Sequence, residues 1–494
     1  MKFWKLALAS AAIAWLSSTV SLAAKTDLVL GIVLEPPHLD PTAGAAAAID
    51  EIVYANIFEG LTRIGPKGDV LPALAESWTK SDDGKVYTFK LHRDVKFHDG
   101  TSFGADDVKF SLDRARDGKS TNAQKGLFAA IDKVEIVDPL TVKVSLKQPS
   151  GDFLYNMGWG DAVIVAPESA ELNKQTPIGT GPFRFDSWAK GSQIVIAKNP
   201  VYWGTPALLD KATFRVIPDP AAATAALLAG DVQAFPVFPS YETIPQFQAD
   251  PRFKVVIGTT EGETVLGMNN KKPPFDNLKV RQAIAHAIDR KTLIDGAMFG
   301  LGTPIGSFFP PHHPSHVDLT SETNYDPQLA KKLLAEAGHA DGFKTTLKLP
   351  PPTYARRGGE IIAAELREIG IEAEIIPVEW AQWLDQVFKN RDYDLTIVSH
   401  TEPNDLNIFA RDDDYYFNYD NLAFKELIKQ IDAVSDGPKR TELYKQAQKV
   451  LANDVPAAFL FQLPKTGIWD AKVEGLWENG PIQANDLTAV KWAN

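Results

Sequence analysis

The stretch from residue 326 to residue 399 constrains the fold most, because strand-like and helix-like patterns alternate there with short joins. Asp326 and Pro327 predict the start of a helix, and Gly338 predicts its end. This alternation is typical of a parallel α/β sheet, in which ligands bind beyond the carboxyl ends of the strands. The predicted elements after that helix are a strand at 345–349, a helix at 359–369, a strand at 371–378, a helix at 380–389 and a strand at 393–399.

The first half of the chain shows short strands and turns instead. Apolar patterns predict strands at 28–34 and 86–91, and strands at 134–137 and 141–146 flank a turn as in a hairpin. These features predict a small α+β unit. No internal repeat or long polar linker separates the two halves, so the domains are expected to be tightly joined or discontinuous in sequence.

Composition excludes several classes of protein. The chain has 494 residues, 44% of them hydrophobic, which predicts two or three folded domains. It has no cysteine, which excludes a disulfide framework, a thiolate zinc site, an iron–sulfur cluster, a cysteine nucleophile and a lipidated cysteine anchor. Its net charge of −12 has the wrong sign for tracking phosphates, so no nucleic-acid partner is expected.

The first residues resemble a secretory signal. Lys2 and Lys5 precede an apolar run at 6–16, and small residues at 21 and 23 predict cleavage after Ala23. The apolar run is shorter than the roughly 20 residues that span a bilayer. We therefore expect residues 1–23 to be a signal peptide, and the mature chain to be a soluble periplasmic protein with a charge of −14, because two lysines and no acids are removed.

The loop after the last predicted strand carries a concentration of charged side chains. His400 opens this loop, Glu402 and Asp405 follow, and Arg411 comes shortly after. Two carboxylates at the carboxyl end of a strand can bind a cationic or zwitterionic ligand through charge-assisted hydrogen bonds. The alternative interpretation is a solvated acidic loop.

Several motifs along the mature chain resemble the family 5 solute-binding proteins of ABC importers, the receptors for dipeptides, oligopeptides, nickel complexes and some opines or sugars. The resemblance implies an α/β, two-lobed periplasmic-binding-protein-like fold of class II, with an extra α+β domain inserted in the first lobe. The motifs are LPALAESW at 71–78, YTFKLHRDVKFHDG at 87–100, DDV at 106–108, IGTGPF at 178–183, NPVYW at 199–203 and the run from Val280 to Asp289.

The resemblance also implies domain limits and partners. We expect a monomer that takes a small-molecule ligand and works with inner-membrane ABC permease subunits and their ATPases, without a cofactor. The expected limits are residues 1–23 for the signal peptide; 24–58, 178–266 and 466–494 for lobe I; 59–177 for the inserted subdomain; and 267–465 for lobe II.

Two of the charged residues match positions that peptide-binding members use. Glu402 takes the place of an aspartate that pairs with the ammonium group of the ligand, and Asp405 takes the place of a second acid. Ser399 and Leu406 depart from the tryptophan and the proline of that pattern. The resemblance therefore implies the charge arrangement of the family site in a changed apolar setting.

A third match would hold the other end of a zwitterion. Arg356 lies fourteen residues before Gly370, where dipeptide-binding members carry an arginine that holds the ligand's carboxylate. A guanidinium can bind a carboxylate through two parallel hydrogen bonds. Arg356 and Glu402 would then form a zwitterion clamp, and the alternative for Arg356 is an exposed loop arginine.

Weaker candidates complete the predicted site. Glu35 follows the first predicted strand in a segment that lies along the cleft in relatives, although its prolines can simply end that strand. Trp380 and Trp383 can stack on a ligand or pack into the core. Tyr416 lies in an aromatic run that can line a pocket or form an edge strand.

The favoured function is capture without chemistry of a peptide-like, zwitterionic or amino-bearing solute, and no catalytic residue, resident metal or cofactor is expected. Ser102, in a Gly-x-Ser-x-Gly pattern, leaves an exported serine hydrolase as an alternative. His312, His313 and His316 leave a receptor for metal chelates as another. A receptor for opines or oligosaccharides is the remaining alternative.

Overall fold

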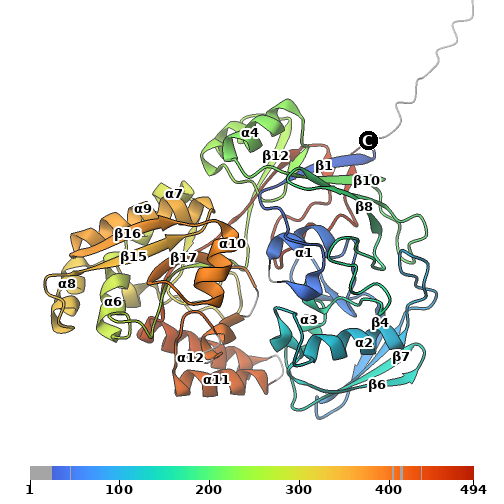
Figure 1. Cartoon of the computed structure of the whole chain (residues 1–494), viewed down its shortest axis with the longest axis horizontal. Helices are drawn as coiled ribbons and strands as arrows, with labels where there is room; N and C mark the ends of the chain where they lie inside the picture. The colour runs from blue at the N-terminus through green and yellow to red at the C-terminus, as the bar shows by residue number, and fades with distance from the viewer. Residues whose placement is uncertain (1–24, 45, 403–404, 412–414, 435–436, 494) are drawn as a thin grey trace, which may run out of the picture.

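The computed structural model describes residues 25–44, 46–402, 405–411, 415–434 and 437–493, and the predicted signal peptide lies outside them. Two large sheets lie in two lobes that stand side by side (Figure 1). None of the helices in the described part of the chain is both long enough and apolar enough to cross a membrane.

The first lobe is built on a seven-stranded sheet in the order β12-β19-β11-β1-β10-β9-β8. β1 lies in its centre, parallel to β10 and β11, and its Leu28, Leu30 and Ile32 are buried. The strands are β1 Asp27–Ile32, β8 Phe183–Ala189, β9 Gln193–Lys198, β10 Lys211–Val216, β11 Ala234–Phe235, β12 Phe253–Gly258 and β19 Lys465–Asp470. The helices of this part are α1 Ala47–Val53, α4 Pro220–Ala229 and α5 Ile244–Gln248, and β20 Val473–Glu474 pairs with β21 Lys491–Trp492.

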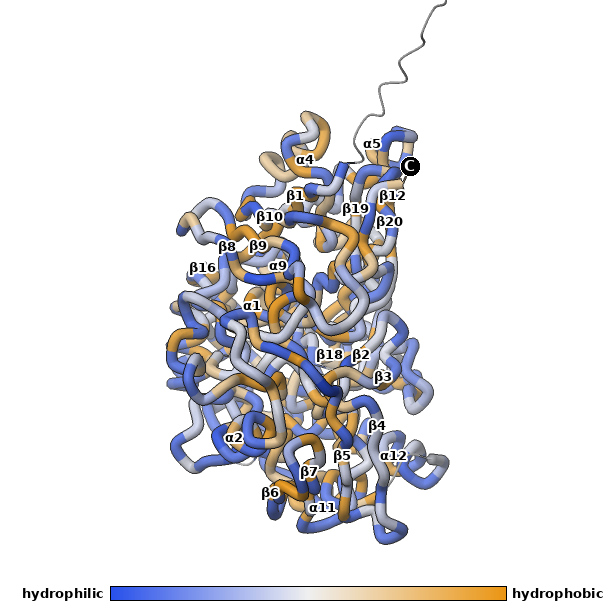
Figure 2. The backbone as a smooth tube through the Cα atoms, turned by 90° about the vertical axis from the view of Figure 1, so that its right-hand side faces the viewer, coloured by the Kyte–Doolittle hydropathy of each residue, from blue (hydrophilic) through white to orange (hydrophobic). Residues whose placement is uncertain are grey.

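A smaller unit interrupts the first lobe, as the resemblance implied. Its four-stranded antiparallel sheet has the order β4-β5-β7-β6, and the predicted hairpin between β6 and β7 is confirmed. Val142, Val144 and Leu146 alternate toward its own apolar core, and Figure 2 shows the hydrophobic stretches along these strands. Its elements are β2 Thr62–Ile64, β3 Val70–Pro72, β4 Ala75–Lys80, β5 Val86–Leu91, α2 Ala105–Arg116, β6 Ile131–Asp138, β7 Thr141–Leu146 and α3 Phe153–Asn156.

The second lobe has a six-stranded sheet in the order β14-β18-β13-β17-β15-β16. β15 runs parallel to β16 and β17, as the alternating pattern predicts. The rest of the sheet is antiparallel, because β13, β14 and β18 come from outside the alternating stretch and join in antiparallel pairs. The strands are β13 Glu263–Met268, β14 Thr303–Pro304, β15 Phe343–Leu349, β16 Ile371–Pro377, β17 Leu395–His400 and β18 Ala457–Gln462.

Helices cover this second sheet. The predicted cap is confirmed, because the Asp326 side chain accepts hydrogen bonds from two backbone amides of α8. α9 begins six residues before its predicted start at Gly359. A Cβ at Gly359 would lie 2.3 Å from Leu349 Cδ1, so this glycine lets the helix approach β15 and does not begin it. The helices are α6 Leu278–Ala287, α7 Arg290–Met298, α8 Pro327–Glu336, α9 Thr353–Glu368, α10 Trp380–Trp383 with a π-helical continuation at Leu384–Lys389, α11 Leu422–Asp432 and α12 Pro438–Asp454.

The chain passes between the two sheets at 259–262, from β12 to β13, and at 463–464, from β18 to β19. These crossings are hydrogen-bonded to each other: the Leu463 amide donates to Gly262 O at 2.6 Å, and the Thr260 hydroxyl donates to Leu463 O. These two crossing segments link the lobes covalently, so any movement of one lobe relative to the other must bend them. The predicted limits of lobe I at residue 266 and of lobe II at residue 465 stay a prediction. All of β13, which begins at Glu263, pairs within the second sheet.

An ion pair with a buried arginine joins α12 of the second lobe to the inserted subdomain. Arg440 is only 4% exposed, and its Nη1 donates to Asp152 Oδ1 at 2.8 Å while its Nη2 contacts Oδ2. A Cβ at Gly151 would lie 2.8 Å from Val434 O, so the two surfaces are in close contact. The structure is therefore a closed arrangement of the lobes.

This contact generates a test. Replacing Asp152 with Asn keeps the shape but removes the charge, which is expected to lower the closed population about tenfold, or about 1.4 kcal/mol. Small-angle X-ray scattering of Asp152→Asn should give a larger radius of gyration than the unmodified protein. The matched control is Asp250→Asn, whose partner Arg252 lies in the same lobe at 2.7 Å. Superimposable scattering from Asp152→Asn and the unmodified protein would contradict this role.

Candidate functional site

Seven carboxyl groups gather where β17 ends and the two lobes meet. We call them the acid cluster, and each is linked electrostatically to other members or to a buried cation beside them. The predicted loop supplies only two of the seven. The members are Asp50, Glu51, Asp161, Glu261, Glu263, Glu402 and Asp405.

The first lobe and its inserted subdomain supply three members. Asp50 and Glu51 lie on α1, and Asp161 lies in the short 3₁₀ turn at 160–162. The Asp50 carboxylate packs directly on this turn, because a Cβ at Gly160 would lie 2.1 Å from Asp50 Oδ1. Asp50 and Asp161 both interact with Glu402 of the second lobe. The acid cluster therefore spans the interface between the lobes.

The second lobe supplies the two predicted acids. Glu402 follows β17, and its Oε2 accepts a hydrogen bond from the Thr401 amide at 3.1 Å. Asp405 begins the 3₁₀ helix Asp405–Ala410 and is 8% exposed. Gln483, from the C-terminal segment packed on the first lobe, donates to Thr401 Oγ1 at 2.5 Å. This bond ties the acidic loop to the opposite lobe.

The crossing at 259–262 and the first residue of β13 supply the last two members. Glu261 Oε1 lies 2.7 Å from His312 Nε2, and Gln462 donates to His312 Nδ1 at 2.8 Å, so Nε2 carries the proton and donates to Glu261. Glu263 begins β13 and is 3% exposed. Its Oε2 has no hydrogen-bond partner among the described residues.

Burial dominates the electrostatics of this cluster. Burial raises the pKa of Asp50, Asp161, Glu263 and Asp405 well above the usual range, and neighbouring carboxylates raise each of them further. Burial also raises the pKa of Glu402, and the Arg411 guanidinium partly opposes this. Like charges that share a buried place repel strongly, so a cation bound among them would be stabilised by all of them.

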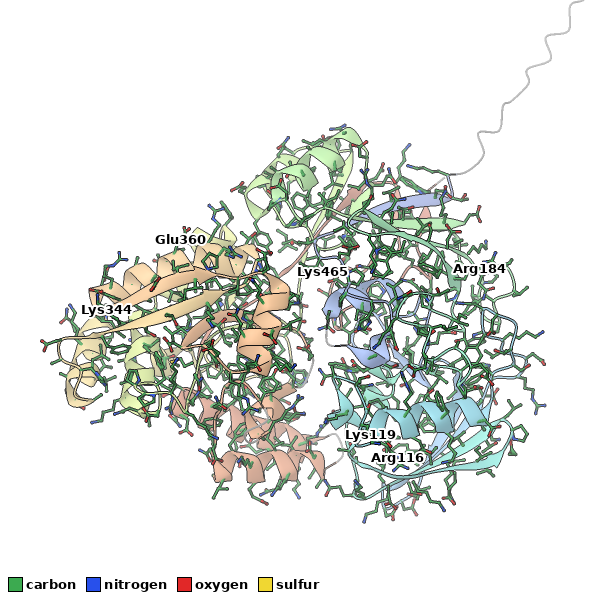
Figure 3. All side chains as sticks on the ribbon, viewed as in Figure 1. Arg116, Lys119, Arg184, Lys344, Glu360 and Lys465 are labelled. Carbon is green, nitrogen blue, oxygen red and sulfur yellow. The ribbon has the colours of Figure 1, made fainter. Side chains whose placement is uncertain are left out.

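Two basic side chains compensate part of this charge. Lys465 begins β19 and is 4% exposed; burial lowers its pKa to about 8, and Glu51 opposes that shift. Figure 3 places Lys465 between the two lobes. Arg411 donates to Asn407 Oδ1 at 3.2 Å, and its guanidinium lies 5.2 Å from the Tyr415 ring centre. Lys465 thus interacts with the first-lobe acid Glu51, and Arg411 is held by Asn407 of the second lobe.

His400 is buried behind the two predicted acids. Its Nε2 lies 2.7 Å from the hydroxyl of Tyr416, a fully buried side chain. Burial, with a smaller effect of Arg411, lowers the pKa of His400 to about 3, so the ring is neutral. His400, Glu402 and Asp405 each place one potential metal-ligand atom within 4.8 Å of the other two. A metal ion could be bound by atoms at this spacing.

Arg356 lies at the carboxyl ends of β15 and β16, in the first turn of α9. Its Nε donates to Pro350 O and its Nη2 to Val378 O, both at 2.9 Å, and its Nη2 lies 3.8 Å from Glu379. Within the described part of the chain, no hydrogen bond or ion pair joins Arg356 to the acid cluster. The clamp of Arg356 with Glu402 therefore stays a prediction.

Among the described residues, the hydrogen bonds of Glu35 and the ring contacts of Trp380 and Trp383 are with residues outside the acid cluster. Glu35 Oε1 accepts hydrogen bonds from Trp188 Nε1 at 2.9 Å and from the amide of Gly191 at 2.7 Å. The rings of Trp380 and Trp383 stack at 5.2 Å, and Trp383 is 3% exposed. Trp383 packs in the core, as the alternative interpretation of this pair expects.

The residues of the two alternative chemistries do not converge. Both ring nitrogens of His98 are hydrogen-bonded to the backbone: the Gly179 amide donates to Nδ1, and Nε2 contacts Gly181 O. Among the described residues, Ser102 has no hydrogen bond to a histidine. His316 Nδ1 contacts a backbone carbonyl, whereas His312 contacts Glu261. Neither a nucleophile–base pair nor a histidine metal cluster is formed by these residues.

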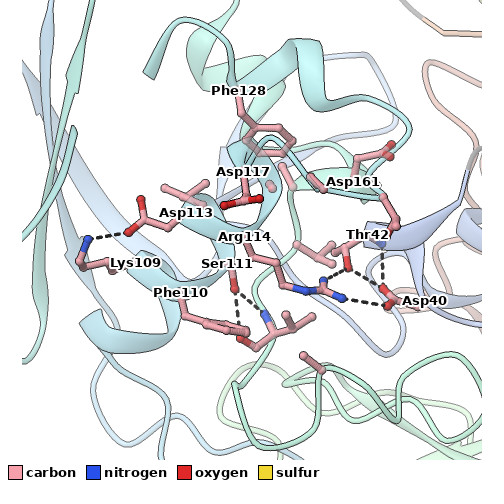
Figure 4. A pocket seen from close by; sticks show the side chains of 18 of the residues that line it. Asp40, Thr42, Lys109, Phe110, Ser111, Asp113, Arg114, Asp117, Phe128 and Asp161 are labelled. Atoms are coloured by element: carbon pink, nitrogen blue, oxygen red, sulfur yellow. Dashed lines mark hydrogen bonds and ion pairs between the residues drawn. The ribbon is translucent and has the colours of Figure 1, made fainter. Parts of the chain in front are cut away.

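Two cavities border the acid cluster. One, of about 750 Å³, lies on the first-lobe side, where Arg114 holds Thr42 and Asp161 lines the wall (Figure 4). The other, of about 660 Å³, lies between the lobes, and both Glu261 and the Asp152–Arg440 pair line it. Only the second cavity is bordered by residues of both lobes.

Sequence reasoning missed five members of the acid cluster. Glu263 carries a usable signal, because it begins a strand whose six residues are all buried, and a buried acid needs a partner. Asp50 and Glu51 are adjacent acids in an otherwise apolar helix. Asp161 gives no comparable signal, since only the packing of the turn against α1 brings it to the site.

The raised pKa of Glu263 generates a test. A buried acid with a raised pKa costs no stability below the pKa of its unfolded form, and the cost grows as the pH rises above that value, whereas glutamine carries no such cost. Glu263→Gln is therefore expected to raise the melting temperature of the ligand-free protein by about 2 °C at pH 8, with a smaller gain at pH 5. The control is Glu372→Gln, an exposed glutamate 3.1 Å from Lys344. A loss of stability at pH 8, or an equal gain at both pH values, would contradict the electrostatic account.

Known proteins share this architecture over most of the chain. The model of the bacterial extracellular solute-binding proteins, family 5 Middle, matches residues 69–416. The dipeptide-binding protein of Escherichia coli (strain K12) is 32% identical over 436 residues, covering 79% of this chain and 81% of that protein. The glutathione-binding protein GsiB of the same organism is 30% identical over 464 residues, covering 89% of this chain and 90% of that protein.

A solved structure agrees with the fold. The ABC transporter-associated periplasmic binding protein DppA from Helicobacter pylori, in complex with peptide STSA, is 28% identical and gives a TM-score of 0.87. The match covers 95% of this chain and 99% of that chain. With its motifs in family order and its two α/β lobes, the chain belongs to the bacterial extracellular solute-binding proteins of family 5.

Proposed function

We propose that this protein is the periplasmic receptor of an ABC importer for a peptide-like or other amino-bearing solute, which it holds between its lobes. The acid cluster is the observation that carries the proposal, because it combines carboxylates of both lobes. The similar proteins named for dipeptide and glutathione binding, and the solved complex with a peptide, support a ligand of this class.

Glu402 and Asp405 are the proposed anchor of the ligand's ammonium group. An ammonium offers three donors, and carboxylates bind it through charge-assisted hydrogen bonds. Asp50 and Asp161 interact with Glu402 across the interface, so a cation there is attracted by both lobes at once. Such a ligand stabilises the closed arrangement over the open one, which is a shift of population without chemistry.

His400, Arg411 and Arg356 have supporting roles in this proposal. His400 and Arg411 shape the loop that carries the anchor, through Tyr416 and Asn407. Arg356 is the candidate partner for a ligand carboxylate, at the carboxyl ends of β15 and β16 where ligands of open sheets bind. Glu35, Trp380 and Trp383 would act through the walls around the site.

The proposal includes a setting and partners. The predicted signal peptide would deliver a monomer to the periplasm, and its closed form would dock on permease subunits whose ATPases supply the energy. The protein itself would bind without turnover.

The ammonium anchor can be tested with the dipeptide Lys-Ala and its Nα-acetylated form. We expect Lys-Ala to raise the melting temperature and the acetylated form to bind at least tenfold more weakly, because it lacks the α-ammonium group. Glu402→Gln should weaken Lys-Ala at least tenfold in isothermal titration calorimetry, about 1.4 kcal/mol, with Glu372→Gln as the control. Equal affinity of Glu402→Gln and the unmodified protein for Lys-Ala would overturn the anchor.

A further inference from the structure

We infer that the ligand carries at least two cationic groups and a net positive charge, so that the receptor selects basic peptides or polyamines over neutral zwitterions. This inference rests on the proposed function, because it assigns the ligand class of the same site.

The charge of the interface is the first argument. Seven carboxyl groups form the acid cluster, whereas Lys465 and Arg411 are the basic side chains that interact with its described members. His312 donates a hydrogen bond to Glu261. One ammonium group in this place would compensate only one of the carboxylates that ionise.

Buried oxygens without partners are the second argument. Glu263 is 3% exposed and Asp161 is 6% exposed, and Glu263 Oε2 and Asp161 Oδ1 have no hydrogen-bond partner among the described residues. A buried acceptor without a donor is costly, so a ligand that supplies the donor gains that free energy.

These two oxygens belong to different parts of the cluster. Asp161 lies in the turn at 160–162 and interacts with Glu402, whereas Glu263 begins β13 of the second sheet and interacts with Asp405 and, more weakly, with Glu402. The two unpartnered oxygens therefore lie on separate elements of the fold, and each is assigned one cationic group. A single ammonium has three donors and serves one such position well, and a second group would serve the other.

The surroundings offer little to a second negative charge. Arg411 is bound to Asn407, Lys465 interacts with Glu51, and Arg357 lies 3.2 Å from Glu242. Arg356, with two of its donors on backbone carbonyls, is the one candidate named above for a ligand carboxylate. A ligand with two cationic groups and at most one carboxylate fits this balance.

The experiment compares Lys-Ala with norleucine-Ala, which differs chiefly by lacking the side-chain ammonium, using isothermal titration calorimetry on the full mature chain. A second arm compares spermidine with butylamine. We expect Lys-Ala to bind at least tenfold more tightly than norleucine-Ala, or spermidine at least tenfold more tightly than butylamine. The arm that responds identifies the peptide or the polyamine as the source of the charge.

The variants locate the second cationic group. Glu263→Gln should reduce the tenfold preference to threefold or less and should raise the melting temperature of the ligand-free protein, a gain that a misfolded variant would not show. Glu372→Gln, the same chemical change at an exposed site, should keep the full preference.

Three results would overturn the inference. Equal affinity for both members of each pair would reject it while keeping the proposed function, because a single ammonium would then suffice. No binding of any of the four compounds would reject the proposed function as well. Tight binding of Ni²⁺ or Ca²⁺ alone, lost in Glu402→Gln, without a response to the organic cations would assign the cluster to a metal ion.

Discussion

Repulsion among carboxylates held between two lobes is the constraint on which the rest of this structure depends. Burial raises the pKa of Asp50 and Asp161 on one side and of Asp405 on the other, and the Glu402 carboxylate raises each of them further. Such an arrangement costs stability in the ligand-free closed state and is relieved by a bound cation. The same charges that disfavour closing without ligand therefore favour closing with it.

The architecture explains how acids from distant parts of the chain reach one place. Glu402 follows the carboxyl end of β17 in the second sheet. The acids from the first lobe lie on α1 and in the turn at 160–162. Two crossings hydrogen-bonded to each other join the sheets, and Glu263 begins the strand that leaves one of them. The Asp152–Arg440 pair adds a direct contact between the lobes.

Local patterns were enough to predict the elements that depend on local rules. The cap at Asp326, the hairpin after β6 and the parallel trio around β15 follow from capping, turn chemistry and periodicity. The predicted start of α9 was wrong because the buried glycine at 359 allows close packing on β15 and does not mark the end of a loop. Only the folded sheet reveals this contact. The strand-end rule found Glu402 and Asp405, and they do lie at the interface. It could not find Asp161, because its position depends on contacts across the fold.

Identification of the compound that the protein carries from the cell tests the central claim most directly. The protein would be isolated without denaturation, and the small molecule it releases on unfolding would be identified by mass spectrometry. The account predicts an organic compound with at least two ammonium or guanidinium groups, present with the unmodified protein and lost from Glu402→Gln. A neutral sugar, an anionic compound or a bare metal ion bound in the same proportion by both proteins would contradict it.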